Sequence, residues 1–215
     1  MLSVPRSKLK ITGLLCLLAT ALLALVVAHT RGPFSFEEPA LKWLGPPSAR
    51  GTWLDVAHLL AVPAISVALA VSFARGLVTR ASLRVVAYAA LGAAALLISE
   101  QVAKPLVQRT FDTEFTFPSG HVTAVSATAV ALWLALYPLL GTRGRTITLV
   151  LGIAWSLLMS LAVVGAQWHT PLDAVGSILL SLGIVTGGSA LLEPACSRAP
   201  FMGAVRARIG DRGGG

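Results

Sequence analysis

Two histidines stand in sequence contexts that suit phosphoryl chemistry. His121 ends the tetrapeptide PSGH at Pro118–His121, and His169 lies in the hexapeptide WHTPLD at Trp168–Asp173. A carboxylate four residues after a histidine can orient one ring nitrogen and leave the other free to attack. A second histidine can then give a proton to the leaving oxygen. The spacing therefore predicts His169 as a nucleophile, Asp173 as its orienting group and His121 as a proton donor.

A phosphate dianion also needs donors, and four nearby residues can supply them. Lys104 and Arg109 lie in the stretch KPLVQRT just before PSGH. Both are cationic, and the arginine fork can hold two phosphate oxygens at once. Ser119 and Gly120 stand where a helix is predicted to begin, and a helix start offers free backbone N–H groups. Glycine permits an anion to approach the backbone closely. These four residues are the predicted phosphate-binding set.

Each of these residues also has a purely structural explanation. Ser119 can cap a helix, and Asp173 can favour the helix dipole in a first turn. Lys104 can anchor a span at the membrane surface and pair with Glu100 four residues earlier. The structural explanation suffices for either histidine motif alone, but the two motifs together favour catalysis. Four further polar residues are interpreted as solvated or interfacial: Asp112, Glu114, His29 and His58.

The composition indicates a membrane protein. The chain has 215 residues, of which 55% are hydrophobic and 12% are charged. Soluble domains carry about 25% charged residues. Several apolar runs reach the roughly 20 residues that a helix needs to cross a bilayer. Because the spans use most of the length, we expect residues 1–202 to form one domain, without a separate soluble part.

Six spans are predicted, and all should be helical because unpaired backbone polar groups are not tolerated in lipid. The third is expected to end near Lys104, since Pro105 disfavours helical geometry in the preceding residue. Pro63 is expected to kink the second span or to mark its late start. The predicted spans are 11–28, 56–73, 82–103, 121–140, 146–166 and 172–192.

The positive charges predict an orientation. With the N-terminus inside, twelve Lys and Arg residues lie on the cytoplasmic side and five on the opposite side. Both termini are therefore expected in the cytoplasm, and the segments carrying Lys104, PSGH and WHTPLD at the outer membrane face. The net charge of +8 is spread in short clusters between spans, which is untypical of a nucleic-acid-binding surface. The Gly- and Arg-rich residues 203–215 are interpreted as a disordered tail.

Three other features of the sequence have plain interpretations. Basic residues before Ile11–Ala28 resemble the layout of a signal peptide, but no small-x-small cleavage site follows, so a retained helix is predicted. Cys16 and Cys196 lack metal-like spacing and are interpreted as apolar filler without a disulfide. Trp43 and Trp53, between the first two spans, suit the membrane–water interface and a short surface helix.

The motifs resemble those of the type-2 phosphatidic acid phosphatases, also called lipid phosphate phosphatases. That family has a six-helix membrane fold and three blocks, KxxxxxxRP, PSGH and SRxxxxxHxxxD. This sequence carries PSGH in full and the HxxxD of the third block as His169 and Asp173. The resemblance implies that His169 forms a phosphohistidine, that His121 is the general acid and later activates water, and that neither a metal nor another cofactor is required.

Two departures distinguish this chain from the family pattern. The arginine of the first block falls at Phe111, although Arg109 occupies a place where some members have an additional arginine. The Ser-Arg pair of the third block falls at Ala162 and Val163. A charge-assisted hydrogen bond contributes about 1.5–3 kcal/mol, so the missing cations are expected to slow turnover tenfold to a hundredfold or more.

The sequence is compatible with several functions. A lipid phosphate or diphosphate hydrolase is favoured, acting at a cell membrane on an undecaprenyl-type diphosphate, phosphatidic acid or phosphatidylglycerol phosphate. The alternatives are a phosphoryl transferase, a lipid-binding or scaffolding relative without activity, and a metal site built from the two histidines and Asp173. A vanadate-dependent halide oxidation, known for soluble relatives of the family, is disfavoured by the six membrane helices. The sequence does not determine the oligomeric state.

Overall fold

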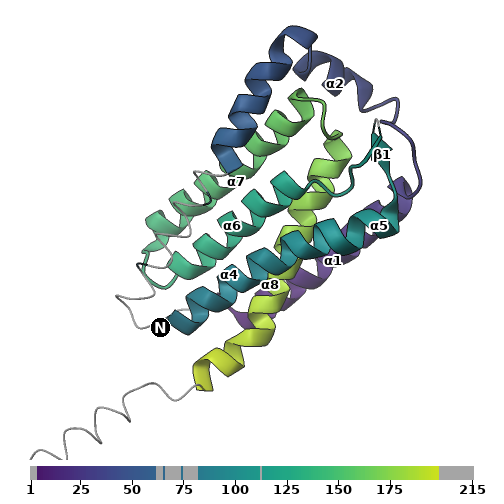
Figure 1. Cartoon of the computed structure of the whole chain (residues 1–215). Helices are drawn as coiled ribbons and strands as arrows, with labels where there is room; N and C mark the ends of the chain where they lie inside the picture. Colours follow the sequence, from purple (N-terminus) through teal and green to yellow (C-terminus); the bar gives the residue numbers. More distant parts are fainter. Residues whose placement is uncertain (1–3, 62–64, 66–73, 75–81, 112, 199–215) are drawn as a thin grey trace, which may run out of the picture.

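Long apolar helices that run side by side form the body of the molecule (Figure 1). The computed structural model describes residues 4–61, 65, 74, 82–111 and 113–198. Within these residues, four helical stretches are long and apolar enough to cross a membrane, and a shorter apolar helix accompanies them. The principal helices are α1 (Arg6–Val27), α4 (Ser82–Ile98), α6 (Gly120–Leu136), α7 (Thr142–Gly165) and α8 (Pro171–Arg198). The prediction of an all-helical, multi-pass membrane protein is confirmed.

The second predicted span, 56–73, lies partly outside the described residues, as does the whole of the predicted tail, 203–215. Residues 50–61 are helical, so the start of the second span is seen. Before it come a short helix, α2 (Glu38–Leu44), and a 3₁₀ turn, η1 (Pro47–Ala49). Trp43 on α2 is 80% exposed, as expected of a short surface helix at the membrane interface.

The third span does not end near Lys104 as predicted. After α4 the chain forms one π-helical turn, η2 (Ser99–Ala103), and continues as α5 (Lys104–Val107). The Lys104 N–H donates to the Ser99 carbonyl, five residues back, and Pro105 then occupies the first turn of α5, where its missing N–H is harmless. The prediction failed because a π turn lets a helix pass a proline that an unbroken α-helix would not tolerate. The left-handed Gln108 ends the helix.

Helix α6 lies in the middle of the bundle, and its first turn carries the site residues Gly120 and His121. It contacts α4, α7 and α8, and most of its side chains are small and buried. Its apolar residues lie on all sides, which is typical of a helix without an exposed polar face. Between α5 and α6, two short antiparallel strands, β1 (Thr110–Phe111) and β2 (Glu114–Phe115), fold the loop back over the end of the bundle.

The two termini of the described helices lie at the end of the bundle opposite the predicted site residues (Figure 1). Helices α1 and α8 pack antiparallel, so the Arg6 Nε at the start of α1 donates to the Ala190 carbonyl near the end of α8 at 2.8 Å. The segments that carry Lys104, Gly120 and His169 meet at the other end, as the sequence predicted for its motifs.

Glycine contacts let α1 and α8 approach closely. A Cβ added at Gly13 would lie 2.6 Å from the Cα and N atoms of Gly187, which are backbone atoms without freedom to move. A Cβ added at Gly187 would lie 3.7 Å from the Gly13 Cα, an ordinary contact distance. Where α1 and α8 cross, a methyl group therefore fits at position 187 but not at position 13.

We expect Gly13→Ala to destabilise the protein and Gly187→Ala to leave it unchanged or slightly more stable. Overpacking a close contact costs about 1–3 kcal/mol, whereas alanine in place of helical glycine gains up to about 1 kcal/mol. Thermal unfolding of both variants in the same detergent measures the difference. Equal midpoints for the two variants would show that the α1–α8 crossing does not limit stability.

Candidate active site

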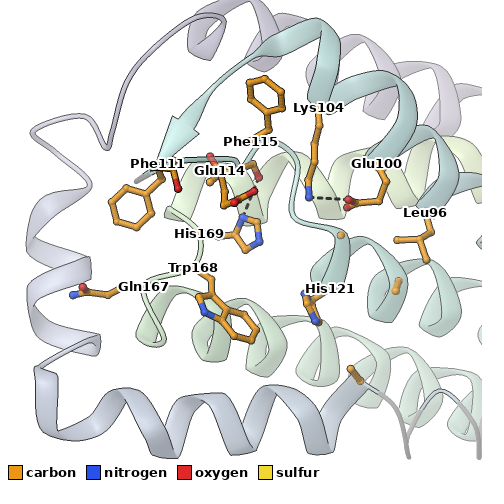
Figure 2. A pocket seen from close by; sticks show the side chains of 15 residues that line it. Leu96, Glu100, Lys104, Phe111, Glu114, Phe115, His121, Gln167, Trp168 and His169 are labelled. Atoms are coloured by element: carbon orange, nitrogen blue, oxygen red, sulfur yellow. Dashed lines mark hydrogen bonds and ion pairs between the residues drawn. The ribbon is translucent and has the colours of Figure 1, made fainter.

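A cavity of about 640 Å³ opens at the end of the bundle where the predicted motifs meet (Figure 2). Its walls come from the start of α6, the turn before α8, the η2–α5 stretch and the small hairpin. Of the predicted site residues, Lys104, Gly120, His121 and His169 line it, whereas Arg109, Ser119 and Asp173 do not. The remaining lining residues are Ala61, Leu96, Glu100, Phe111, Thr113, Glu114, Phe115, Thr116, Ala124, Gln167 and Trp168.

His169 sits on the turn between α7 and α8, with only 8% of its surface exposed. Its Nδ1 lies 3.0 Å from the Thr116 carbonyl oxygen, an interaction drawn in Figure 2. A carbonyl can only accept, so Nδ1 carries the proton and donates it. The other ring nitrogen, Nε2, is therefore unprotonated and able to act as a nucleophile.

Asp173, which was predicted to orient His169, lies close to its ring but makes no direct hydrogen bond to it in this structure. Asp173 Oδ2 lies 3.9 Å from the His169 Nδ1, beyond hydrogen-bond distance. The same Oδ2 accepts from the Thr170 N–H at 2.8 Å, and Oδ1 accepts from Arg109 at 3.0 Å. Asp173 thus contributes a nearby negative charge, and the Thr116 carbonyl takes over the orienting hydrogen bond.

The surroundings of His169 favour its neutral form. The pKa of His169 is lowered from 6.5 to about 3. Burial is the main cause, the nearby Lys104 and His121 add to the lowering, and the hydrogen bond to the Thr116 carbonyl opposes it. A protonated imidazole cannot attack phosphorus, so a depressed pKa keeps the nitrogen lone pair available at neutral pH.

This depressed pKa predicts a loss of stability in acid. Between pH 6.5 and about 3 the unfolded chain binds a proton at His169 that the folded chain excludes. The free energy of unfolding should therefore fall with pH in that window, by up to about 1.4 kcal/mol per pH unit from this residue. We expect His169→Gln to show a shallower decline of the thermal midpoint from pH 7 to pH 4. Parallel declines in both proteins would contradict this assignment.

Lys104 reaches into the cavity but is paired with Glu100. The Lys104 Nζ lies 2.8 Å from the Glu100 Oε2, as predicted from their spacing along the helix (Figure 2). The other oxygen, Oε1, is buried and has no hydrogen-bond partner among the residues that the structure describes. It lies where a Cβ added at Gly120 would clash with it. Glycine at position 120 thus leaves room for this carboxylate beside the first turn of α6. An incoming anion must compete with Glu100 for the ammonium group.

The first turn of α6 supplies backbone donors and the second histidine. Ser119 is fully buried, and its hydroxyl accepts from the Val122 N–H as a helix cap. The structural explanation considered for Ser119 therefore holds, and its predicted contact with phosphate has no support here. Gly120 and His121 are the next residues, and N–H groups at such positions lack intrahelical acceptors. The Trp168 ring lies against His121, with ring centroids 5.5 Å apart.

Arg109, which was predicted to bind phosphate, does not line the cavity. Its guanidinium is fully buried and bound to two carboxylates, Glu37 and Asp173, so it is not available to a phosphate in the cavity. A guanidinium is stable in a buried place only if carboxylates compensate the cost of its desolvation, and Glu37 and Asp173 do so here. Arg109 therefore does not line the cavity in this structure, and its role in phosphate binding stays a prediction from the sequence.

The two family arginine positions are filled by apolar residues in different surroundings. Phe111 lines the cavity, whereas Val163 is buried in a cluster of apolar residues that includes Val122 and Met159. Lys104 is consequently the sole Lys or Arg that lines this cavity within the described part of the chain.

Sequence reasoning missed several residues around the site. Thr116 acts through its carbonyl group, which leaves no signal in a sequence. Glu37 comes from the segment before α2, 72 residues from Arg109, and no motif marks it. His58, interpreted as interfacial, has its ring centroid 6.0 Å from that of Trp168. Since Trp168 also contacts His121, both histidines lie next to the same indole ring. Among the described residues, no group of three or more His, Cys, Asp or Glu side chains is arranged to hold a metal ion.

Comparison with known proteins finds similarity in part of the sequence and in the fold. Residues 96–193, which include both histidines, match the family described as the PAP2 superfamily. A search of curated proteins finds no match to this chain. The fold is similar to the crystal structure of the first transmembrane PAP2-type phosphatidylglycerolphosphate phosphatase from Bacillus subtilis, with a TM-score of 0.65 and 19% identity over 88% of this chain and 98% of that one. Residues 96–193, with the PSGH turn and the HxxxD helix start, are thus similar in sequence to the PAP2 superfamily, and the helical bundle is similar in fold to a membrane phosphatase.

Proposed function

We propose that this protein is a membrane-bound lipid phosphate or diphosphate phosphatase that works through a phosphohistidine. The observation that carries the proposal is the His169 ring, held at Nδ1 by the Thr116 carbonyl, in a cavity that it shares with Lys104 and His121. The match of residues 96–193 to the PAP2 superfamily and the likeness to the fold of a membrane phosphatase support the reaction class.

The proposed reaction has two steps. The His169 Nε2 attacks phosphorus as the bond to the lipid oxygen breaks, and His121 donates a proton to that oxygen. Lys104 and the free N–H groups at the start of α6 stabilise the negative charge on the phosphoryl oxygens. His121 then takes a proton from water, whose oxygen attacks the phosphohistidine and releases phosphate. Transfer to another acceptor instead of water would make the protein a transferase.

A second cavity supports a lipid substrate over a soluble one. This groove of about 260 Å³ runs between α4 and α6 and shares Leu96 and Ala124 with the site cavity. Apart from Tyr88, its other lining residues are apolar or small, among them Ala89, Gly92, Ala93, Thr128 and Ala131. An alkyl or prenyl chain can thus extend from the reacting phosphate along the bundle, where burial of each CH₂ group contributes about 0.8 kcal/mol.

The candidate substrates are polyprenyl diphosphates of the undecaprenyl type, phosphatidic acid and phosphatidylglycerol phosphate, the last being the substrate class named for the Bacillus subtilis structure. By the charge distribution between spans, the site is proposed to face the extracytoplasmic side of the cell membrane. The test is phosphate release from this lipid panel by the detergent-purified protein in EDTA, with His169→Ala as the blank. Release that EDTA abolishes would contradict the metal-independent mechanism.

A binding protein without activity is the second candidate. The cavity has one lysine where the family pattern predicts three cations, and Glu100 already occupies it. Lipid phosphate that binds to the purified protein but is never hydrolysed, with any member of the panel, would favour this candidate.

Restoring the missing cation should increase activity. Phe111 lines the cavity at the place of the family arginine, so Phe111→Arg is expected to raise kcat/KM about tenfold by adding one charge-assisted contact to the phosphoryl group. Phe111→Leu is the control for loss of the ring alone. If the arginine variant does not exceed the leucine variant, Phe111 does not face the reacting phosphate.

A further inference from the structure

Arg109 is the centre of a buried charge network beside the His169 turn. Its Nη1 donates to the Asp173 Oδ1 at 3.0 Å, and its Nη2 donates to the Glu37 Oε2 at 2.5 Å. The three side chains are almost completely buried. Two carboxylates share one guanidinium, so when all three groups are ionised the network carries one excess negative charge.

Glu37 connects this network to the start of α8. Its Oε1 accepts from the Leu172 N–H at 3.0 Å, and its Oε2 also accepts from the Phe34 N–H at 2.9 Å. Burial raises the pKa of Glu37, but hydrogen bonds from Phe34, Thr170, Leu172 and Arg109 outweigh that effect and lower it, so the carboxylate is ionised. The first N–H groups of a helix need an external acceptor, and here a residue 135 positions earlier in the chain provides it.

Arg109 also reaches His169 through its backbone. The Arg109 carbonyl accepts from the Thr116 N–H at 3.0 Å, and the Thr116 carbonyl in turn holds the His169 Nδ1 at 3.0 Å. One residue therefore governs both the acceptor of the ring proton and the carboxylate of Asp173, 3.9 Å from the same nitrogen.

We propose that Glu37 and Arg109 are positioning residues for His169, which they hold in its reactive geometry without contacting the substrate. This inference depends on the phosphohistidine mechanism proposed above. When Nε2 bonds to phosphorus while Nδ1 keeps its proton, the imidazole ring becomes positively charged. The excess negative charge of the network, fixed close to Nδ1, stabilises that ring, because preoriented charges in a buried site need no reorganisation during the reaction.

The test replaces Glu37 and its neighbour Glu38. Glu37→Gln removes the buried charge with little change of shape, while Glu38→Gln removes a half-exposed charge that pairs with Lys42 on the surface of α2. For Glu37→Gln we expect kcat to fall about 10- to 100-fold, with KM and the dissociation constant of vanadate, a phosphate analogue, within about threefold of wild type. Glu38→Gln should match wild type in all three quantities.

Two further comparisons separate positioning from folding. Glu37→Asp keeps the charge on a shorter side chain, and we expect its kcat to exceed that of Glu37→Gln at the same thermal midpoint. A Glu37→Gln kcat equal to that of Glu38→Gln would overturn the inference, as would a loss of vanadate binding in parallel with kcat. If the wild-type protein itself releases no phosphate, the proposed function fails. If the wild type is active and Glu37→Gln is equally active, only the inference about Glu37 fails.

Discussion

Replacing His169 by alanine is expected to reduce phosphate release by at least about 10³-fold, because the proposed covalent step loses its nucleophile. The Nδ1 contact with Thr116 holds the ring so that the attacking nitrogen needs no reorientation. Alanine removes that nitrogen but leaves the cavity wall formed by α6 intact. The measurement is phosphate release under saturating lipid substrate, with vanadate binding as the check that the site remains folded.

The companion variant His121→Asn distinguishes covalent catalysis from direct attack by water. In the proposed mechanism His121 activates the water that cleaves the phosphohistidine, so its loss should slow the second step and allow phosphoenzyme to accumulate. With a labelled lipid whose leaving group is good enough to need no proton, we expect labelled protein in His121→Asn and none in His169→Ala. Label in both variants, or hydrolysis that survives in His169→Ala, would contradict His169 as the nucleophile.

Lys104→Met is expected to lower kcat/KM by about 10²- to 10³-fold, the loss typical of removing one donor aimed at a developing negative charge. The effect should lie at the upper end of this range because no other Lys or Arg lines the cavity within the described residues. The substitution also leaves the Glu100 carboxylate without its partner, which adds repulsion toward the phosphate.

Two controls accompany this variant. Lys42→Met breaks an ion pair of similar geometry, 2.9 Å from Glu38, on the exposed surface of α2, and should have no effect on kcat/KM. The double variant Glu100→Gln with Lys104→Met removes the unpaired carboxylate and should recover part of the activity. If Lys42→Met and Lys104→Met lower activity equally, Lys104 contributes only to the surface charge and not to the reacting phosphate.

The sequence alone was enough to predict a membrane protein and to single out the two histidines that line the cavity. Apolar runs of about 20 residues can satisfy their backbone polar groups in lipid only as helices, so composition and length suffice to predict a helical bundle. His121 and His169 each start or precede a helix, and the alternation of spans brings their segments to the same end. The pairing of Lys104 with Glu100 was also predictable, since it depends only on the four-residue spacing along a helix.

Tertiary structure alone decided which partners the buried charges have. Arg109 lies five residues from Lys104 in the sequence, yet its side chain turns away from the cavity because Glu37 and Asp173 meet on its other side. That choice depends on where a distant segment folds, and a buried cation is stable only where carboxylates compensate its lost hydration. The orienting group of His169 is likewise the Thr116 carbonyl. Every residue carries such a carbonyl, so only the folded chain determines which one reaches the ring.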